Sequence, residues 1–321
     1  MGSQGKLEYE VKALSTEALP QSGMLIKVEY SSLNYKDALS FSGNKGVTRN
    51  FPHTPGIDAV GEIIESDSAD FSPGQKVLVV GYDLGMNTAG GFGEYINAPK
   101  EWVMPLPVGL TPKQSMAWGT AGFTAALCVE KLINNGLVPD SGPILVSGAS
   151  GGVGSIAISL LVKLGFNVHA LTGKPDQQAF FDGLGVSEIV SLDDFIASPD
   201  KPLLKSLYAG AVDVAGGKVL STMLKVLQYG GSIACCGLVD SMKLETTVLP
   251  FILRGNHLLG VDSVELPLNK KCQVWQKIAQ QWSLPQLENA CQIIGKDELV
   301  EALSLVLQGK AQGRYILDHN L

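Results

Sequence analysis

The length, composition and charge of the chain narrow the classes of protein to which it can belong. Its 321 residues exceed what one hydrophobic core usually serves, so two domains are expected. With 45% hydrophobic and 17% charged residues, the chain is too apolar to be disordered, and its net charge of −7 excludes a basic nucleic-acid-binding protein.

The N-terminal third of the sequence has the pattern of a β-rich domain. Short apolar or alternating runs are separated by Gly and Pro, which mark turns. These runs predict strands at residues 25–30, 59–65, 76–80 and 93–96. We therefore expect a small, Gly-rich and partly closed β structure in this part of the chain.

From Thr111 onward the sequence predicts strands that alternate with helices. Thr111 precedes Pro112, which is typical of a helix start, and a helix is predicted over residues 121–132. Strands are then predicted at residues 144–147, 168–171, 188–191, 212–214 and 233–236, with helical stretches between them. This alternation predicts an α/β fold with a doubly wound parallel sheet. Helices near 270–282 and 298–308 and a strand at 314–318 complete the predicted elements.

A Gly-rich turn at residues 148–154 follows the first of these strands and opens a helix. Its spacing is that of a dinucleotide-binding turn in which Ala149 replaces the first Gly. Such a turn lets the backbone approach a pyrophosphate at Gly151 and lets the helix pack on the strand at Gly154. The candidate phosphate-binding residues are Ser150, Gly151, Gly152, Val153 and Gly154. A tight strand–helix turn that binds no ligand is the alternative.

The end of the second strand of this series indicates which dinucleotide is bound. NAD-binding domains usually carry Asp or Glu there to hold the ribose 2′-hydroxyl, and this strand end carries neither. Thr172, Gly173 and Lys174 instead offer a hydrogen-bond donor, a turn and a cation to a 2′-phosphate. We therefore predict NADPH as the cofactor, with an ordinary surface lysine as the alternative interpretation of Lys174.

The cysteines and the apolar segments indicate the compartment. The chain has five cysteines without C-x-x-C spacing, and this odd number argues against a disulfide framework. Charged residues among the first twenty exclude a signal peptide, and the longest apolar run, at residues 156–162, is too short to cross a membrane. We expect a cytoplasmic protein with reduced thiols and no membrane partner.

Several sequence blocks, in one order along nearly the whole chain, resemble a single protein family. The blocks are residues 32–39, 49–52, 55–58, 119–125, 148–154, 247–254, 260–264 and 312–314. They are similar to the YhdH/YhfP branch of quinone oxidoreductases, a zinc-free branch of the medium-chain dehydrogenase/reductase superfamily that includes acrylyl-CoA reductases. The resemblance implies a GroES-like catalytic domain at residues 1–117 and 265–321 and an NADPH-binding Rossmann domain at 118–264.

The same resemblance predicts that no zinc is bound. Other members of the superfamily hold a catalytic zinc, and the matching positions here are Asn34, Ile57 and Thr120. None of these side chains suits zinc. Residues 81–100, near the position of a structural zinc lobe in relatives, contain no Cys. Lewis-acid activation of an alcohol is therefore not expected.

The resemblance implies a reaction and four catalytic candidates. NADPH would deliver hydride to the β-carbon of an α,β-unsaturated acyl thioester, in a cleft between the domains. The candidates are Tyr35, Asn34, Asp37 and Arg314. Tyr35 either contacts the cofactor and delivers a proton or is an amphipathic aromatic residue at a helix start. Asn34 either binds the cofactor or enolate or caps the helix.

The two charged candidates also have alternative interpretations. Asp37 is expected to orient Lys36, Arg49 or Arg314, and a surface ion pair is the alternative. Arg314 is expected to bind a phosphate or to shape the cleft, and without the resemblance it would pass for a surface residue. Arg49 is a candidate for the phosphates of CoA.

Further contacts follow from the resemblance alone. Tyr35, Thr120, Leu238, Ile252 and Ser263 are expected to lie near the cofactor, although Ile252 also fits a core residue. A strand predicted at residues 257–264 is expected to pair with a second copy and form a homodimer.

Two other functions stay open at this point. One is an NADPH-dependent quinone or enone oxidoreductase with no use for CoA, since fold does not fix function. The other is a non-catalytic NADPH-binding sensor or crystallin-like protein. A cluster of basic side chains at the mouth of the site would favour an enoyl-CoA substrate, and an apolar mouth would favour a quinone or enone.

Overall fold

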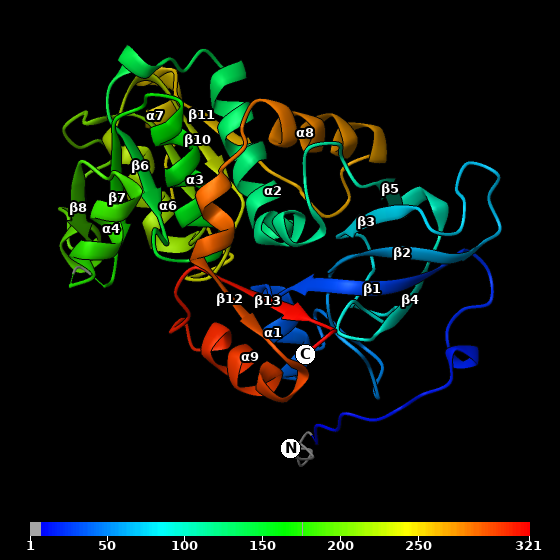
Figure 1. Cartoon of the computed structure of the whole chain (residues 1–321). Helices are drawn as coiled ribbons and strands as arrows, with labels where there is room; N and C mark the ends of the chain where they lie inside the picture. The colour runs from blue at the N-terminus through cyan, green and yellow to red at the C-terminus, as the bar shows by residue number, and fades with distance from the viewer. Residues whose placement is uncertain (1–7, 175) are drawn as a thin grey trace. The chain divides into compact units, whose positions relative to one another are not determined.

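The computed structural model describes residues 8–174 and 176–321 (Figure 1). The chain divides into two compact units. The first unit comprises Met1–Thr120 and Val264–Leu321, and the second comprises Ala121–Ser263. Both units contain a sheet with helices, so the predicted α/β class is confirmed. Within the described ranges, no helix is long and apolar enough to cross a membrane.

The first unit is built on a mostly antiparallel, seven-stranded sheet. Its strands are β12 (Cys291–Ile294), β13 (Arg314–Asp318), β1 (Met24–Ser32), β2 (Asp58–Ser66), β3 (Lys76–Val80) and β5 (Val103–Pro105) in spatial order, with β4 (Tyr95–Ala98) paired to β1. Alternate residues of β1, among them Met24, Ile26 and Val28, are buried in one apolar cluster. The sheet is thus half-buried, as period-two patterning requires.

The first unit also contains helices, of which α1 (Tyr35–Phe41) and α9 (Leu299–Leu307) pack on strands of this sheet. The others are α8 (Leu268–Gln280) and the short 3₁₀ helices at Thr16–Ala18, Lys100–Trp102, Pro285–Ala290 and Lys296–Glu298. Helix α1 begins directly after β1, because the carboxylate of Asp37 accepts a hydrogen bond from the Asn34 amide at 2.8 Å. Ala38 of α1 packs with Leu303 of α9 and with Leu317 of β13.

The second unit contains the predicted doubly wound parallel sheet, so this prediction is confirmed. Its strands in spatial order are β11 (His257–Gly260), β10 (Leu227–Cys235), β9 (Tyr208–Asp213), β6 (Ile144–Ser147), β7 (Val168–Thr172) and β8 (Glu188–Ser191). Every pairing is parallel, and the strand order reverses between β6 and β9. Open α/β sheets bind ligands at the carboxyl ends of the strands beside such a reversal.

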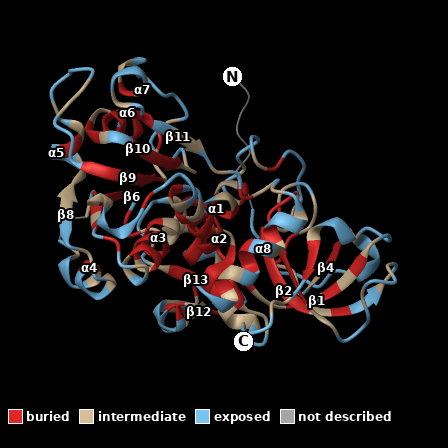
Figure 2. Cartoon of the chain, turned by 90° about the horizontal axis from the view of Figure 1, so that it is seen from above, coloured by how far each residue is buried: buried red, intermediate tan, exposed pale blue. Residues whose placement is uncertain are grey.

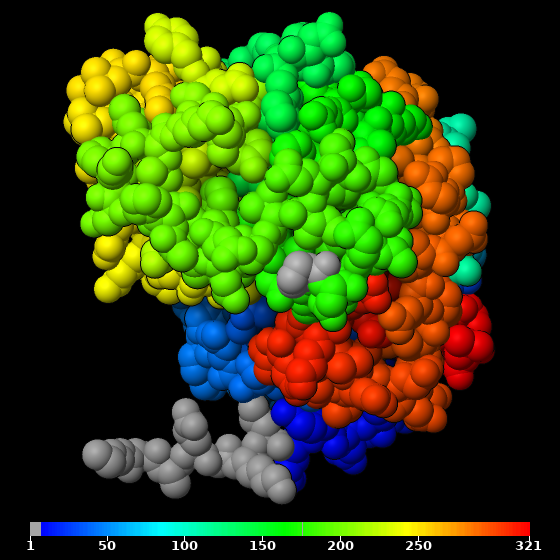
Figure 3. All heavy atoms as spheres, turned by 90° about the vertical axis from the view of Figure 1, so that its left-hand side faces the viewer, coloured from blue at the N-terminus to red at the C-terminus, as the bar shows by residue number. Residues whose placement is uncertain are grey.

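The helices of the second unit cover this sheet. They are α3 (Gly152–Lys163), α4 (Gln178–Leu184), α5 (Leu192–Ile196), α6 (Gly217–Val226), α7 (Leu249–Arg254) and the 3₁₀ helix Pro139–Ser141. All six residues of β9 are buried (Figure 2), which is typical of a strand covered on both faces. The heavy atoms of this unit are green to yellow in Figure 3.

Helix α2 (Pro112–Asn134) passes from the first unit into the second. It begins at Pro112, as predicted, and it is longer than the predicted residues 121–132. Gly119 interrupts it with φ 50° and ψ −160°, a conformation that L side chains rarely adopt. The unit boundary follows one residue later, after Thr120.

Candidate functional site

The Gly-rich turn after β6 is fixed by close packing of backbone. A Cβ atom on Gly154 would lie 2.3 Å from the Gly148 carbonyl oxygen, and one on Gly148 would lie 2.4 Å from Cγ2 of Val214. The first helical hydrogen bond of α3 runs from the Ser155 amide to Gly151. The preceding amides have no partner within the helix, so they can bind an anion such as a pyrophosphate.

The buried carboxylate of Asp213, which the sequence did not indicate, binds groups at the carboxyl ends of β6 and β9. Asp213, the last residue of β9, accepts hydrogen bonds from the Ser147 hydroxyl and the Gly216 amide, each at 2.9 Å. Burial raises the pKa of Asp213. Gly237 lies so close that a Cβ atom there would be 2.1 Å from the Val214 carbonyl oxygen. The carboxyl ends of β6, β9 and β10 therefore form one tightly packed edge.

The predicted 2′-phosphate residues lie at the same edge, at the end of β7. The amide of Ala149 in the turn donates to Leu171 of β7 at 3.4 Å, so the two loops are neighbours. Thr172 is buried, and its hydroxyl accepts a hydrogen bond from the Lys174 amide at 3.0 Å. The described part of this loop thus brings Thr172, Gly173 and Lys174 beside the Gly-rich turn.

The remaining cofactor candidates of the second unit differ in exposure. Leu238 and Ile252 are 56% and 68% exposed, so the alternative interpretation of Ile252 as a core residue was wrong. Helix α7 has only six residues, and so short an apolar segment does not reveal its buried face. Ser263 is buried, and its hydroxyl accepts a hydrogen bond from Thr124 at 2.7 Å.

In the first unit, the candidate Asp37 is a fully buried carboxylate. It accepts hydrogen bonds from the amides of Asn34 and Ile57, both at 2.8 Å. Burial, followed by the negative charge of Asp58, raises the pKa of Asp37 from 3.8 to about 7. Because Asp37 is fully buried, the alternative of a surface ion pair was wrong. Asp37 is linked to Arg314 through the Asn34 side chain and through its charge, and its expected role in orienting a cation stays a prediction.

Asp58, at the start of β2, is the central acceptor of this region. It accepts hydrogen bonds from the Asn34 side chain at 2.8 Å, from the Thr120 amide at 2.7 Å and from the Thr120 hydroxyl at 2.5 Å. The Ser32 hydroxyl also donates to it. Sequence reasoning included Asp58 in a family block and gave it no role, because a lone Asp at a strand start does not reveal its partners.

Arg314 approaches the same group from the start of β13 and is 3% exposed. Its Nη1 donates to the Leu33 carbonyl at 3.0 Å and to the Asn34 side chain at 3.2 Å, while Nη2 has no partner among the described residues. Burial lowers the pKa of Arg314, and the charge of Asp58 opposes this shift. Arg314 is therefore a buried residue whose guanidinium donates to backbone carbonyls, and it does not lie on the surface.

Six residues, five of them buried and Thr120 half-buried, therefore form one hydrogen-bonded group, which we call the carboxylate network. Its members are Ser32, Asn34, Asp37, Asp58, Thr120 and Arg314. Gly119 lies against it, because a Cβ atom there would be 2.2 Å from the Ser32 hydroxyl and 2.8 Å from an Asp58 oxygen. The network holds two carboxyl groups and one guanidinium, and the raised pKa makes Asp37 the carboxyl group that readily takes up a proton.

Tyr35 differs from the other catalytic candidates in exposure. It is the first residue of α1 and is 37% exposed, whereas Asn34, Asp37 and Arg314 are buried. The polar atoms of the Asn34 side chain already bind Arg314 and Asp58. Within residues 8–174 and 176–321, the Tyr35 hydroxyl has no hydrogen-bond partner. Of the four candidates, Tyr35 thus presents the polar group that a ligand can reach.

The positions that hold zinc in related dehydrogenases do not fit a metal in this chain. Ile57 has no ligand atom and is 2% exposed, and Thr120 and Asn34 both donate to Asp58. Across the described ranges, no group of three His, Cys, Asp or Glu residues could hold a metal ion. The donor chemistry of the three positions therefore does not fit zinc.

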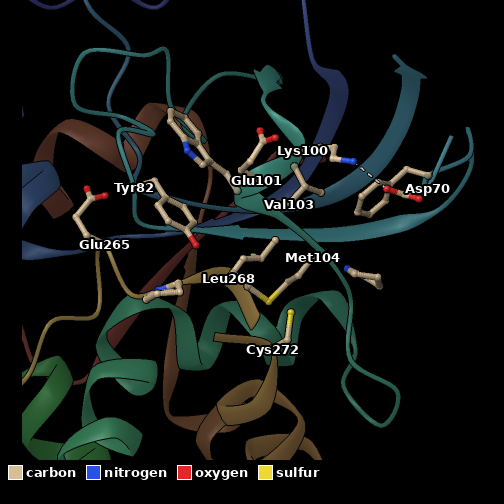
Figure 4. Close-up of a pocket in the computed structure, with 13 residues that line it drawn as sticks. Asp70, Tyr82, Lys100, Glu101, Val103, Met104, Glu265, Leu268 and Cys272 are labelled. Atoms are coloured by element: carbon tan, nitrogen blue, oxygen red, sulfur yellow. Dashed lines mark hydrogen bonds and ion pairs between the residues drawn. The ribbon is translucent and has the colours of Figure 1, made fainter. Parts of the chain in front are cut away.

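An open pocket of about 710 Å³ lies elsewhere in the first unit (Figure 4). Tyr82, Trp102, Met104 and Cys272 are among its lining residues, and the rings of Tyr82 and Trp102 stack at 5.8 Å. Beneath Tyr82 lies the fully buried Lys271, which donates to the Val80 carbonyl at 2.6 Å and to the Val264 carbonyl at 2.8 Å. No predicted site residue lines this pocket, so it is separate from the carboxylate network.

Comparison with known proteins places these features in a family. Two family models match: the alcohol dehydrogenase GroES-like domain at residues 20–108 and the zinc-binding dehydrogenase at residues 152–280. The "Putative quinone oxidoreductase YhfP" of Bacillus subtilis is 43% identical over 97% of this chain and 94% of its own length. The acrylyl-CoA reductase AcuI of Ruegeria pomeroyi is 40% identical over 98% of this chain and 96% of its own length.

Solved structures of relatives have the same fold. The yhdH oxidoreductase of Salmonella enterica, in complex with NADP, superposes with a TM-score of 0.94 at 39% identity and covers 99% of this chain and 98% of its own. The yhfP protein of Bacillus subtilis, with NAD bound, gives 0.92 at 43% identity over 96% and 94% of the two chains. The chain therefore belongs to the YhdH/YhfP branch of the medium-chain dehydrogenase/reductase superfamily and is an oxidoreductase.

Proposed function

We propose that the protein uses NADPH to reduce the carbon–carbon double bond of a small α,β-unsaturated acyl thioester such as acrylyl-CoA. The observation that carries the proposal is the exposed, unpartnered hydroxyl of Tyr35, which follows the firmly held Asn34 at the start of α1. Similarity to AcuI over nearly the whole chain supports an acrylyl thioester as the substrate.

The cofactor residues proposed here lie along the carboxyl edge of the second sheet. When bound, NADPH supplies a hydride to the β-carbon of the substrate. The amides of residues 152–154 would bind its pyrophosphate, with Ser150 and Gly151 beside them. The end of β7 supports NADPH over NAD, because Thr172, Gly173 and Lys174 present no carboxylate to a 2′-phosphate. Relatives of this branch crystallised with NADP and with NADPH support the same cofactor, alongside one crystallised with NAD.

In this proposal Tyr35 is the catalytic residue, and the carboxylate network positions it. As hydride reaches the β-carbon, negative charge builds on the thioester oxygen, and a donor placed there stabilises it. The Tyr35 hydroxyl donates to that oxygen and passes a proton toward the α-carbon. Asn34, Asp37 and Arg314 position Tyr35 by fixing the start of α1. Thr120, Leu238, Ile252 and Ser263 stay predicted cofactor contacts.

A quinone or enone substrate is the second candidate, and the 43% identity to the YhfP protein favours it. Both functions use the same cofactor and the same Tyr35. They differ in whether the substrate carries a thioester. A non-catalytic role is set aside, because the chain belongs to a family of oxidoreductases.

The test of function follows the absorbance of NADPH with purified protein. Acrylyl-CoA, free acrylate and a simple quinone are compared as substrates, and NADH replaces NADPH in a parallel series. We expect fast oxidation of NADPH with acrylyl-CoA and slow oxidation in the other reactions. A quinone that reacts faster than the thioester would overturn the proposed substrate, and equal rates with NADH would overturn the cofactor preference.

Replacement of Tyr35 by Phe tests the catalytic role directly. We expect Tyr35→Phe to lower kcat by about a hundredfold or more, because a positioned proton donor contributes about that factor. The KM for NADPH should stay near the wild-type value. Tyr229→Phe is the matched control, since Tyr229 is 84% exposed in the second unit. A Tyr35→Phe enzyme with unchanged kcat would exclude proton delivery by this residue.

We also propose an assembly and a location for the enzyme. Strand β11 is an edge strand of the second sheet, so it can pair with the same strand of a second copy and form a homodimer. The two functional domains are proposed to be residues 1–117 with 265–321 and residues 118–264, in the cytoplasm. Light scattering of the purified protein should give twice the mass of the chain, and a monomer mass would contradict the dimer.

A further inference from the structure

Residues 42–56 form a segment, which we call the basic loop, between helix α1 and Ile57, whose amide binds Asp37 of the carboxylate network. The loop leaves the end of α1 and returns at Ile57. One oxygen of Asp37 accepts the Ile57 amide at 2.8 Å, and the other accepts the Asn34 amide. Asp37 therefore joins the end of the loop to Asn34, the residue that precedes Tyr35.

Internal hydrogen bonds give the basic loop a defined conformation. The Asn44 side chain accepts the Gly46 amide at 2.8 Å, and the Asn44 carbonyl accepts the amides of Val47 and Thr48 at 3.0 Å. Thr48 is fully buried, and its hydroxyl lies 2.6 Å from the Ser40 hydroxyl. The loop thus holds its exposed side chains on an ordered backbone.

Two cations and one aromatic ring project from this backbone. The Lys45 ammonium donates to the Arg49 carbonyl at 3.0 Å and lies 4.6 Å from the centre of the Phe51 ring. Lys45 and Arg49 are exposed, and Phe51 is 39% exposed. Among the described residues, neither cation forms an ion pair with a carboxylate. In a chain of net charge −7, this is a local positive surface.

Asp83, the carboxylate that is connected to the loop through Asn87, does not neutralise Lys45 or Arg49. The Arg49 amide lies 3.5 Å from the Asn87 side-chain oxygen, and Asn87 in turn donates to Asp83 at 2.8 Å. The other oxygen of Asp83 accepts the Thr88 hydroxyl at 3.0 Å. Asp83 is thus bound to neutral groups, and the side chains of Lys45 and Arg49 stay available to an anion from solution.

We propose that the basic loop binds the 3′-phosphorylated adenosine diphosphate portion of a coenzyme A thioester. Arg49 and Lys45 bind its phosphates, since a guanidinium and an ammonium both form charge-assisted hydrogen bonds with phosphate oxygens. Phe51 packs against the adenine ring. The inference rests on the proposed thioester reduction and assigns the residues that distinguish a CoA thioester from a short thioester with the same reacting group.

The test compares acrylyl-CoA with the acrylyl thioester of N-acetylcysteamine, which lacks the nucleotide. In the double variant Lys45→Glu/Arg49→Glu we expect the KM for acrylyl-CoA to rise about tenfold at low salt, and added KCl should shrink this difference. The KM values for NADPH and for the short thioester should not change. Lys296→Glu/Lys310→Glu carries the same charge change on the same unit and should behave like the wild type.

A second variant separates stacking from charge. Phe51→Ala should raise the KM for acrylyl-CoA about fivefold with little dependence on salt, since the lost contact is apolar. Thermal unfolding of each variant, followed by circular dichroism, shows whether the fold is kept.

The outcomes distinguish the two proposals. If the wild type reduces both thioesters and the double variant leaves the KM for acrylyl-CoA unchanged, the basic loop does not bind CoA and the reductase proposal stands. If the KM rises equally for both thioesters, the loop acts on the reacting group and the inference also fails. If the wild type reduces neither thioester, both proposals fail together.

Discussion

In the second unit the Gly-rich turn offers backbone amides to a ligand, whereas in the first unit the carboxylate network consists of side chains that bind one another. The turn comes from seven consecutive residues, 148–154, and needs the absence of side chains at Gly148 and Gly154. The network draws on residues 32 to 314 and needs particular functional groups. Substitutions should therefore affect binding in the one region and stability in the other.

The largest effect is expected from removal of the central acceptor of the network. Asp58→Ala leaves the side chains of Ser32, Asn34 and Thr120 without their common acceptor and removes a negative charge that acts on the buried Arg314. Loss of one member of a buried charged group destabilises a protein by about 3–5 kcal/mol. Urea denaturation should show this decrease in the free energy of unfolding. Asp83→Ala is the control, since Asp83 binds neutral surface groups, and an equal loss there would contradict the special role of Asp58.

An added methyl group in the Gly-rich turn should weaken cofactor binding. In Gly154→Ala the new Cβ atom would lie 2.3 Å from the Gly148 carbonyl oxygen, so the turn has to shift. Such overpacking costs about 1–3 kcal/mol, which corresponds to an increase of about ten- to a hundredfold in the Kd for NADPH. Fluorescence titration with NADPH measures this change. Gly183→Ala in α4 meets no atom within 4 Å and should keep the wild-type Kd.

The effect that is smallest over a single pH unit is a change in the pH dependence of stability. Because the pKa of Asp37 is raised from 3.8 to about 7, the folded protein binds a proton that the unfolded chain has released between these values. This term makes stability fall as pH rises from about 4 to 7, with a slope of at most about 1.4 kcal/mol per pH unit. Asp37→Asn should lack this slope in urea denaturation across the range, while the similar term from Asp213 remains.

The sequence predicted the parts of the molecule that local patterns determine. The alternation of strands and helices predicted the parallel sheet, and the spacing of Gly151 and Gly154 predicted the turn that opens α3. Strand β10 begins at Leu227, six residues before its predicted start, because Leu227 already pairs with Tyr208 of β9; the register then shifts over residues 228–231, which include Gly230 and Gly231, and pairing resumes at Ser232. Tertiary pairing thus decided the strand boundary where local composition misled.

The network was harder to predict, because its members meet only in the folded chain. Asn34 and Asp37 share one motif, so their proximity followed from the start of a helix. Asp58 gains its importance from Thr120 and Arg314, which are 62 and 256 residues away in the sequence. Periodic patterns of apolar residues reveal contacts within one helix or strand and not contacts between residues so far apart in the sequence. The burial of Arg314 was equally hidden, since it depends on the pairing of β13 with β1 and on contacts with Leu33 and Asn34.

The buried side chains of Asp58 and Lys271 mark two junctions at which the second unit could be exchanged for another domain. The second unit begins after Thr120, which Asp58 holds, and it ends before Val264, whose carbonyl Lys271 holds. Within that unit the hydrogen bond between Thr124 and Ser263 joins its first and last turns. Residues 121–263 therefore form a cassette whose entry and exit are neighbours, as in an inserted domain. A nucleotide-binding unit exchanged at these two junctions would leave both anchoring charges with the catalytic unit.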